Sequence, residues 1–277
     1  MNIAISKRVF VRVLIGLAVL AVIGINGVLY YRMKVKPGAS SAASGKAESV
    51  AIELTLVTAK NCAECFDLNQ MIQPLKGNAE FSISKEETVD YDSREGKKLV
   101  KKYELDKIPA ILVRGDVESV FDLASFLQNL GKQAEDGTLI VSNIPPPYLE
   151  LGSGEVKGKF KATYLTYKDC AECYDPQLHK QALAALVMMP SEEEFLDYSD
   201  PLAQEMIAKY AITSLPTLLL QGELNLYQQL AEVWPTVGTQ EEDGTYIFRQ
   251  GQSLMGIYYD LNSKSVVKPE PVPDQAE

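Results

Sequence analysis

The chain contains two copies of one unit, each centred on the motif Cys-Ala-Glu-Cys. Residues 55–67 align with residues 163–175, so the second cysteine pair follows the first by 108 residues. Later blocks keep the same order at an offset of 107: 89–91 with 196–198, 102–109 with 209–216, 115 with 222, and 135–138 with 242–245. Such spacing indicates an internal duplication. The sequence therefore predicts two domains of one fold, with the same dithiol in each.

Each copy begins with a predicted strand, at residues 51–58 and 160–166, rich in β-branched and apolar types. The cysteine motif follows directly. Asn61 precedes Glu64 by three positions, and Asp169 precedes Glu172 in the same way, which is the pattern of a helix capping box. We therefore expect each cysteine pair to lie in the first turn of a helix.

The rest of each copy also repeats a mixed pattern. A second strand is expected to end near Tyr91 and Tyr198, and a second helix near Tyr103 and Tyr210. Short apolar runs follow, at residues 108–113 and 215–220, typical of buried strands. A helical crossover between strands makes them parallel. The predicted fold class is α/β in both copies.

The dithiols carry the candidate chemistry. Side chains three positions apart on a helix are neighbours, and a helix N-terminus favours a thiolate. We expect Cys62 and Cys170 to attack a substrate disulfide and Cys65 and Cys173 to resolve the mixed disulfide. Two alternatives stay open: static disulfides that only staple the chain, and a four-thiolate zinc site formed by both pairs.

Each copy resembles a thioredoxin-fold domain, over roughly residues 50–130 and 158–235. The resemblance rests on the Cys-x-x-Cys motif and on the Ile-Pro or Leu-Pro block that follows it 43–44 residues later. It implies a central mixed sheet flanked by helices. It also implies cis peptides beside the dithiols, with a substrate groove formed by Ile108, Pro109, Leu215 and Pro216.

The copies depart from the thioredoxin pattern around the cysteines. Asn61 and Asp169 replace the usual tryptophan, and Ala-Glu replaces Gly-Pro between the cysteines. The family's buried acid corresponds to Leu56 and Tyr164, neither of which accepts a proton at neutral pH. The residues expected to tune the thiols are Asn61, Glu64, Asp169 and Glu172. His179, the one histidine in the chain, is expected on the surface.

Residues 13–31 carry no charge and are apolar, and a helix of that length spans roughly 28 Å, close to a bilayer core. We expect a short tail at 1–12, a transmembrane anchor at 13–31 and a flexible linker at 32–48. The domains are expected at 49–157 and 158–267, and the boundary between them follows the turn-prone prolines 145–147. A disordered tail is expected at 268–277.

The first 36 residues hold six basic and no acidic residues, so the remainder has a net charge of −16 within a total of −10. Such an acidic body is a poor match for nucleic acid. The sequence predicts a membrane-tethered, extracytoplasmic thiol–disulfide oxidoreductase that acts on protein thiols or disulfides with a further redox partner and needs no cofactor. A non-catalytic binding module that uses the same fold is the competing class.

Overall fold

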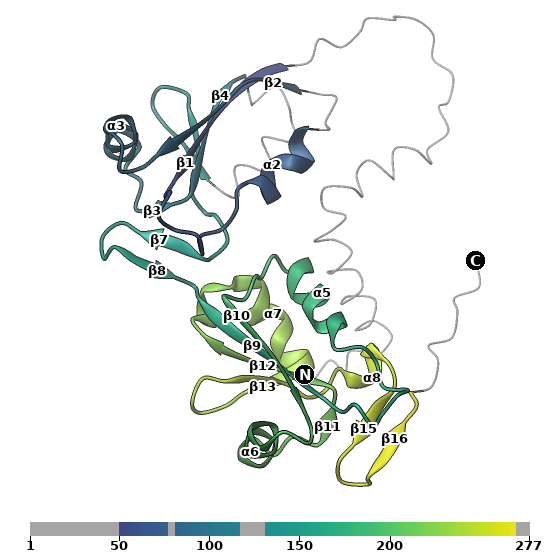
Figure 1. Ribbon diagram of the computed structural model, residues 1–277. Helices are drawn as coiled ribbons and strands as arrows, with labels where there is room; N and C mark the ends of the chain where they lie inside the picture. Colours follow the sequence, from purple (N-terminus) through teal and green to yellow (C-terminus); the bar gives the residue numbers. More distant parts are fainter. Residues whose placement is uncertain (1–49, 77–80, 117–130, 270–277) are drawn as a thin grey trace, which may run out of the picture. The chain divides into compact units, whose positions relative to one another are not determined.

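The computed structural model describes residues 50–76, 81–116 and 131–269, which divide into two compact units at Gly158 and Lys159 (Figure 1). The first unit contains β1 (Val50–Thr58), α2 (Asn69–Lys76), β2 (Phe81–Asp90), α3 (Arg94–Tyr103), β3 (Lys107–Ile108), β4 (Ala110–Gly115), β5 (Gly131–Gln133), β6 (Leu139–Val141), β7 (Tyr148–Glu150) and β8 (Glu155–Lys157).

The described part of the second unit repeats this order. It contains β9 (Phe160–Thr166), α5 (Gln177–Ala185), β10 (Glu192–Asp197), α6 (Pro201–Lys209), β11 (Ser214–Leu215), β12 (Thr217–Gly222), η2 (Leu224–Leu226), α7 (Gln228–Val237), β13 (Gly238–Gln240), β14 (Tyr246–Phe248), α8 (Gln252–Met255), β15 (Tyr258–Asp260) and β16 (Ser265–Val267). Both predicted first strands, and the strand–helix alternation after them, are confirmed.

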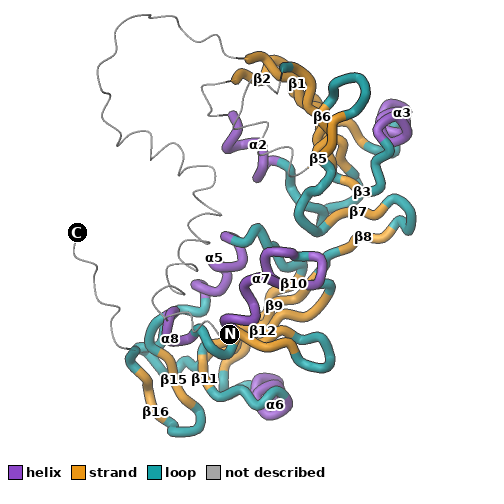
Figure 2. Tube along the Cα trace, turned by 180° about the vertical axis from the view of Figure 1, so that it is seen from behind, coloured by secondary structure: helices purple, strands orange, loops and turns teal. Residues whose placement is uncertain are grey.

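Each unit has a five-stranded mixed sheet, in the order β2-β1-β4-β6-β5 and β10-β9-β12-β14-β13. The first two strands of each copy run parallel, as a helical crossover requires. The strand after the proline runs antiparallel to the first strand, which makes each sheet mixed. Helices lie on both faces of each sheet: α2 opposite α3, and α5 with α7 opposite α6 (Figures 1 and 2). The arrangement is consistent with two thioredoxin-like domains.

The apolar runs predicted at 108–113 and 215–220 are each split at their proline. Ile108 and Leu215 end short strands that pair with a terminal hairpin, β7–β8 or β15–β16, in a separate three-stranded sheet. The residues after the prolines enter the main sheet. The hairpins of residues 148–157 and 258–267 are therefore equivalent in the two units.

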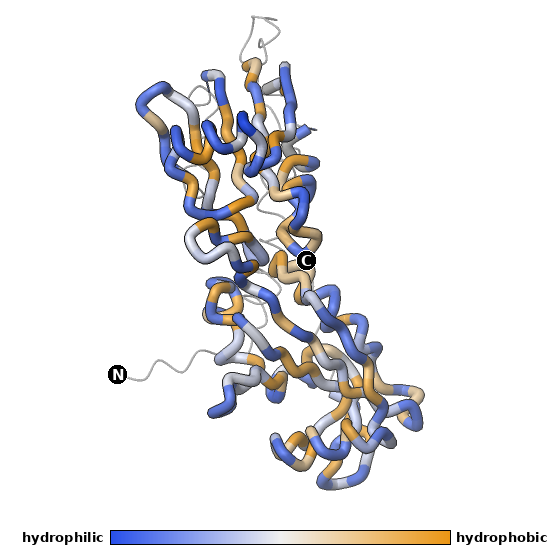
Figure 3. Tube along the Cα trace, turned by 60° about the vertical axis from the view of Figure 1, so that its left-hand side comes forward, coloured by the Kyte–Doolittle hydropathy of each residue, from blue (hydrophilic) through white to orange (hydrophobic). Residues whose placement is uncertain are grey.

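The cores follow the alternation of side chains along the strands. Tyr164 of β9 packs in the cluster that contains Leu183 of α5 and Trp234 of α7. The next residue, Leu165, packs on the other face with Ala203 of α6. Figure 3 shows hydrophobic residues interspersed with hydrophilic ones along the chain of both units. Both faces of the central strands are therefore covered by helices.

The repeated Glu-Asp-Gly-Thr segments have a structural role. Asp136, in the turn between β5 and β6, accepts hydrogen bonds from Lys102 Nζ at 2.6 Å and from the Tyr103 hydroxyl at 3.1 Å. The second unit repeats both bonds, at 2.8 and 2.9 Å, with Asp243, Lys209 and Tyr210. The bonds tie the hairpin to the end of the second helix, where Tyr103 and Tyr210 are both buried.

The repeated glycines, Gly115 and Gly222, stand where the third main strand passes close to the first. Their φ angles are +124° and +136°, in a region that favours glycine. A Cβ at these positions would lie 2.6 Å from the Ala51 carbonyl oxygen and 2.4 Å from that of Lys159. The repeated glycine therefore reflects close backbone packing.

Among the described residues, no helix is both long and apolar enough to cross a bilayer. The expected anchor at 13–31, the tail at 1–12 and the linker at 32–48 lie outside the described residues. Of the expected C-terminal tail, Lys268 is described, whereas residues 270–277 are not.

Candidate functional site

Both cysteine pairs are closed disulfides, each in the turn between the first strand and the first helix of its unit. Cys62 and Cys65 are joined with their Cα atoms 5.3 Å apart, and Cys170 and Cys173 with 5.4 Å. A backbone bond closes each turn, from the N–H of the second cysteine to the carbonyl of the first, at 3.3 and 3.1 Å. The duplication has thus kept one geometry at both sites.

The expectation that each pair opens a helix is wrong. α2 begins at Asn69 and α5 at Gln177, in each case four residues after the second cysteine. The side chain at the helix start is an aspartate: Asp67 accepts from the Asn69 N–H at 2.9 Å, and Asp175 accepts from the Gln177 N–H at 2.9 Å. A disulfide needs its Cβ atoms closer than helical i, i+3 neighbours stand, and the turn supplies that approach.

The helix N-termini lie too far from the cysteines to stabilise their thiolates. The charge effect of a helix N-terminus falls off within its first turn. Cys62 and Cys170 each lie seven residues before the helix begins. The helix therefore does not supply the thiolate stabilisation that the sequence suggested, and Glu64 and Glu172 do not cap it. Asn61, Glu64, Asp169 and Glu172 are all exposed on the turn.

The expected cis peptides are confirmed at Ile108-Pro109 and Leu215-Pro216. They lie beside the dithiols: the carbonyl oxygen of Ile108 is 3.9 Å from Cys65 Sγ, and that of Leu215 is 3.9 Å from Cys173 Sγ. In the disulfide form the sulfur has no proton to donate. In the reduced form the thiol of the second cysteine can donate to this carbonyl, and such a bond favours the protonated thiol.

The expected groove residues contribute backbone only. The side chains of Ile108 and Leu215 have no exposed area, and both prolines are buried. What these segments can offer a substrate is therefore their peptide groups. The substrate groove expected at these residues stays a prediction, and any such groove would use their backbone, because the residues on both sides of each proline belong to the core sheets.

The two sites differ in exposure. Cys62 and Cys65 are both partly buried, whereas Cys170 is 8% exposed and Cys173 is partly buried. In the second unit the cysteine expected to attack is thus the more enclosed of the pair. A reagent of ordinary size reaches Cys62 more easily than Cys170.

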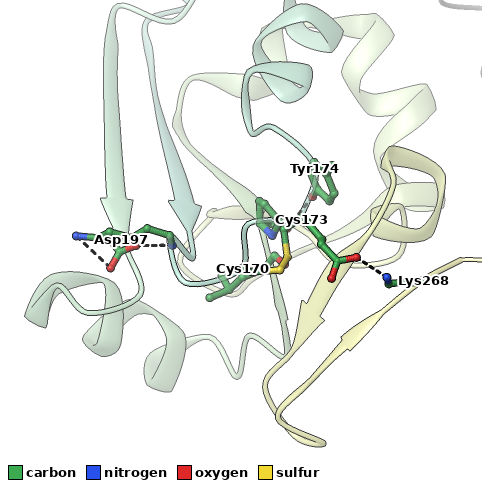
Figure 4. The surroundings of a disulfide bond; sticks show 9 residues. Cys170, Cys173, Tyr174, Asp197 and Lys268 are labelled. Carbon is green, nitrogen blue, oxygen red and sulfur yellow. Dashed lines mark hydrogen bonds and ion pairs between the residues drawn. A yellow bond between two sulfur atoms is a disulfide. The ribbon is translucent and has the colours of Figure 1, made fainter.

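Charged groups surround the second disulfide (Figure 4). Glu172, between its cysteines, pairs with Lys268, and Asp197 and Lys268 lie on either side of the disulfide. Asp197 Oδ2 accepts from the backbone N–H of Lys168 at 2.8 Å. Burial tends to raise the pKa of Asp197, but hydrogen bonds from Ser199 and from Lys168 outweigh it and lower that pKa. Asp197 is therefore a carboxylate that holds the turn before the motif.

A backbone hydrogen bond that the sequence did not predict anchors the residue after each second cysteine. The backbone N–H of Phe66, next to Cys65, donates to the carbonyl of Pro147 at 2.7 Å, and Tyr174, next to Cys173, donates to Ile257 at 2.7 Å. Pro147, which directly precedes the hairpin, thus also holds the turn of the first dithiol. The equivalent contact in the second unit involves no proline, so the sequence repeat did not reveal it.

The expectation that His179 lies on the surface is wrong. His179 is 1% exposed, and its Nε2 lies 2.9 Å from the Tyr174 hydroxyl. That hydroxyl donates to the carbonyl of Pro216 at 2.6 Å. Burial lowers the pKa of His179 to about 3 and raises the pKa of Tyr174. The imidazole is therefore neutral at physiological pH. In the sequence, the one sign of this buried contact was that Tyr174 directly follows the cysteine motif.

At the position of the family's buried acid, Leu56 is 5% exposed and Tyr164 has no exposed area. Tyr164 donates its hydroxyl proton to Glu193 at 2.9 Å, and burial raises the pKa of Tyr164. Neither side chain is a proton acceptor for the dithiols.

Within the described residues, no group of three or more histidine, cysteine, aspartate and glutamate side chains is placed to bind a metal. All four cysteines are engaged in disulfides inside their own units. The zinc alternative would require both bridges to be reduced and the two units to bring their thiolates together.

Fold and site define a protein with two thioredoxin-like units, each carrying a Cys-x-x-Cys disulfide beside a cis-proline segment. No protein-family description and no curated protein matches the chain. Among solved structures, it is similar to a mutant of the alkylhydroperoxide reductase protein AhpF of Enterococcus faecalis, with 18% identity, 63% of this chain and 83% of that chain covered, and a TM-score of 0.20. It is also similar to the NTD_N/C domain of AhpF from the same organism, with 16% identity, 63% and 84% coverage, and a TM-score of 0.20. The fold assignment rests on the topology described above.

Proposed function

We propose that the chain is a membrane-tethered thiol–disulfide oxidoreductase whose two Cys-Ala-Glu-Cys dithiols exchange disulfides with other proteins. One observation carries the proposal: in both units the cysteine pair forms a disulfide in a surface turn, beside a carbonyl that faces the second sulfur. A bridge that closes so short a loop adds little to stability. A role in exchange accounts better for its presence in both copies.

The exchange proceeds by two sulfur displacements. A substrate thiolate attacks Sγ of Cys62 or Cys170; the intramolecular S–S bond breaks, and the second cysteine leaves as a thiolate and takes up a proton. A second substrate thiolate then attacks the substrate sulfur of the mixed disulfide and releases the first cysteine. The dithiol gains two electrons and two protons, and the substrate forms a disulfide. The reverse sequence reduces a substrate disulfide.

The membrane attachment in this proposal derives from the apolar, uncharged sequence of residues 13–31. The extracytoplasmic location derives from the closed disulfides of both units, because such a compartment permits disulfides to persist. The substrates are protein thiols or disulfides, with a further redox partner that resets the dithiols. The chemistry needs no cofactor, because cysteine sulfur alone carries the electrons.

The test uses the full-length protein in detergent, equilibrated with glutathione buffers of graded potential and quenched by alkylation. Each dithiol should titrate as a two-electron couple, and the oxidised protein should oxidise a model dithiol catalytically. A binding module with static bridges would show disulfides that glutathione leaves intact until the protein unfolds. Stoichiometric zinc in protein purified under reducing conditions would favour the metal alternative.

A further inference from the structure

The second unit has a set of buried polar side chains next to its dithiol that the first unit lacks. Tyr174, His179 and Thr217 are 7%, 1% and 0% exposed. Their counterparts in the first unit are Phe66, Met71 and Ala110. The two copies thus share the motif but differ at the neighbouring positions, which are apolar in the first and polar in the second. Buried polar groups are costly unless they are paired.

The two hydrogen bonds of the Tyr174 hydroxyl determine where its own proton and that of His179 lie. The Pro216 carbonyl can only accept, so the Tyr174 hydroxyl proton lies on the 2.6 Å contact between them. The 2.9 Å contact with His179 must then use a proton on Nε2, donated to the Tyr174 oxygen. A neutral imidazole carries one such proton. His179 thereby holds the hydroxyl in the orientation that donates to Pro216.

This chain of hydrogen bonds connects the two sides of the dithiol. Tyr174 follows Cys173 in the chain, and Pro216 follows Leu215. The Leu215 carbonyl faces Cys173 Sγ at 3.9 Å, and the next carbonyl, of Pro216, accepts from Tyr174. The consecutive residues Cys173 and Tyr174 therefore contact the carbonyls of the consecutive residues Leu215 and Pro216. The Tyr174 bond does not involve sulfur, so it can persist when the disulfide opens.

We propose that Tyr174 and His179 are a positioning pair that holds Cys173 against the Leu215–Pro216 segment in the reduced protein, which makes the second disulfide easier to close and the second dithiol more reducing. The inference rests on the proposed exchange function. In the closing step the Cys173 thiolate attacks Cys170 Sγ, and the bond from Cys170 to the substrate sulfur breaks. The substrate sulfur leaves with the electron pair and is protonated. Holding a nucleophile in place raises the rate and equilibrium of such intramolecular steps.

The first unit provides the natural comparison. Its Cys65 also lies 3.9 Å from a carbonyl, that of Ile108, while the disulfide is closed. Phe66 has no hydroxyl to donate to the Pro109 carbonyl. Once the first disulfide opens, apolar packing and backbone bonds hold the cysteine in place. The first dithiol is therefore expected to close less favourably than the second.

The experiment measures the equilibrium between glutathione and the second dithiol in the full-length protein, with Cys62 and Cys65 replaced by serine. Tyr174→Phe and His179→Met should each reduce the equilibrium constant for disulfide formation about fivefold, or about 20 mV for a two-electron couple. The double variant should lose no more than either single one, because the two residues act as a unit. His179→Gln, whose amide can still donate, should keep most of the effect.

A gain-of-function variant guards against simple loss of folding. Phe66→Tyr with Met71→His, in a chain with Cys170 and Cys173 replaced by serine, should raise the equilibrium constant of the first dithiol. The fluorescence of Trp234, in the second unit, verifies that the Tyr174 and His179 variants are folded. If the parent dithiols exchange but the variants match their parents, the inference is overturned and the proposed function stands. If the parent dithiols do not exchange, both are overturned.

Discussion

The carbonyl oxygen of Ile108 lies 3.9 Å from Sγ of Cys65, and Leu215 stands in the same relation to Cys173. Each unit thus places an acceptor next to its second cysteine. A hydrogen bond from a neutral thiol to this acceptor raises the pKa of that thiol. We therefore expect the first cysteine to be the more acidic of each pair, even though no helix N-terminus stabilises its thiolate. The assignment of Cys62 and Cys170 as nucleophiles consequently depends on the proline segment.

Cysteine trapping tests this assignment. Cys65→Ala or Cys173→Ala should accumulate mixed disulfides through Cys62 or Cys170, because the resolving thiol is missing. The complexes would be detected on non-reducing gels after acid quenching. Cys62→Ala and Cys170→Ala are the matched controls, and equal trapping by them would show that the two cysteines of a pair have the same reactivity.

The location and the accessibility of the sites can be measured together. A membrane-impermeant maleimide applied to intact, mildly reduced cells should label Cys62 faster than Cys170, since Cys170 is 8% exposed and Cys62 is only partly buried. Labelling that requires lysis would contradict the extracytoplasmic location. Faster labelling of Cys170 in intact cells would instead contradict the difference in exposure.

Local charge should also separate the two thiols. Asp169 precedes Cys170, whereas neutral Asn61 precedes Cys62. A carboxylate roughly 7 Å from a thiolate, at an effective dielectric of about 40–80, raises the thiol pKa by about half a unit to one unit. Asp169→Asn should lower the pKa of Cys170 by that amount, measured from the pH dependence of alkylation in a chain whose other cysteines are replaced. Asn61→Asp should do the opposite at Cys62.

Two results would show that the charge at Asp169 does not set the pKa difference between the two thiols. One is a lower pKa for Cys170 than for Cys62 in the parent chain, and the other is an unchanged pKa of Cys170 in Asp169→Asn. This test is separable from that of the positioning pair. Asp169 is exposed and acts through charge, so added salt should weaken its effect. The hydrogen bonds of Tyr174 and His179 are buried and should respond little to salt.

Because His179 is buried, we expect the folded state of the second unit to lose stability in acid. Burial lowers its folded pKa to about 3, while the unfolded value is about 6.5, so the folded state excludes a proton that the unfolded state binds. The stability that His179 provides is present above about pH 6.5 and is lost as the pH falls toward 3. Between pH 7 and pH 5 the loss should be about 2 kcal/mol.

Urea unfolding followed by Trp234 fluorescence reports on the second unit, which holds the single tryptophan of the chain. His179→Gln has no titrating group, so its stability should fall less between pH 7 and pH 5 than that of the parent. Parallel pH profiles for the two proteins would mean that His179 is protonated in the folded state or exposed.

The repeat supplied much of the fold and the site at the sequence level. Both first strands, the parallel crossover and the two cis-prolines beside the second cysteines occur as predicted. The strands and the crossover depend on local pattern and on elements that recur in both copies, whereas the cis-prolines were expected from the resemblance to thioredoxin-fold domains. The spacing of the cysteines was likewise enough to indicate a disulfide or a dithiol in each copy.

What the sequence determined by itself was the duplication, the two dithiols and the strand–helix order, because each depends on residues close together in the chain. Only the tertiary structure decided where the first helices begin and what surrounds the thiols. Asp67 and Asp175 competed with the motif as helix starts, and the short disulfide turn favoured the later position. His179 can be buried because its Nε2–H donates to the Tyr174 hydroxyl, and that hydroxyl in turn donates to the Pro216 carbonyl from a distant part of the chain. Burial of a polar side chain depends on such partners, which no local pattern specifies.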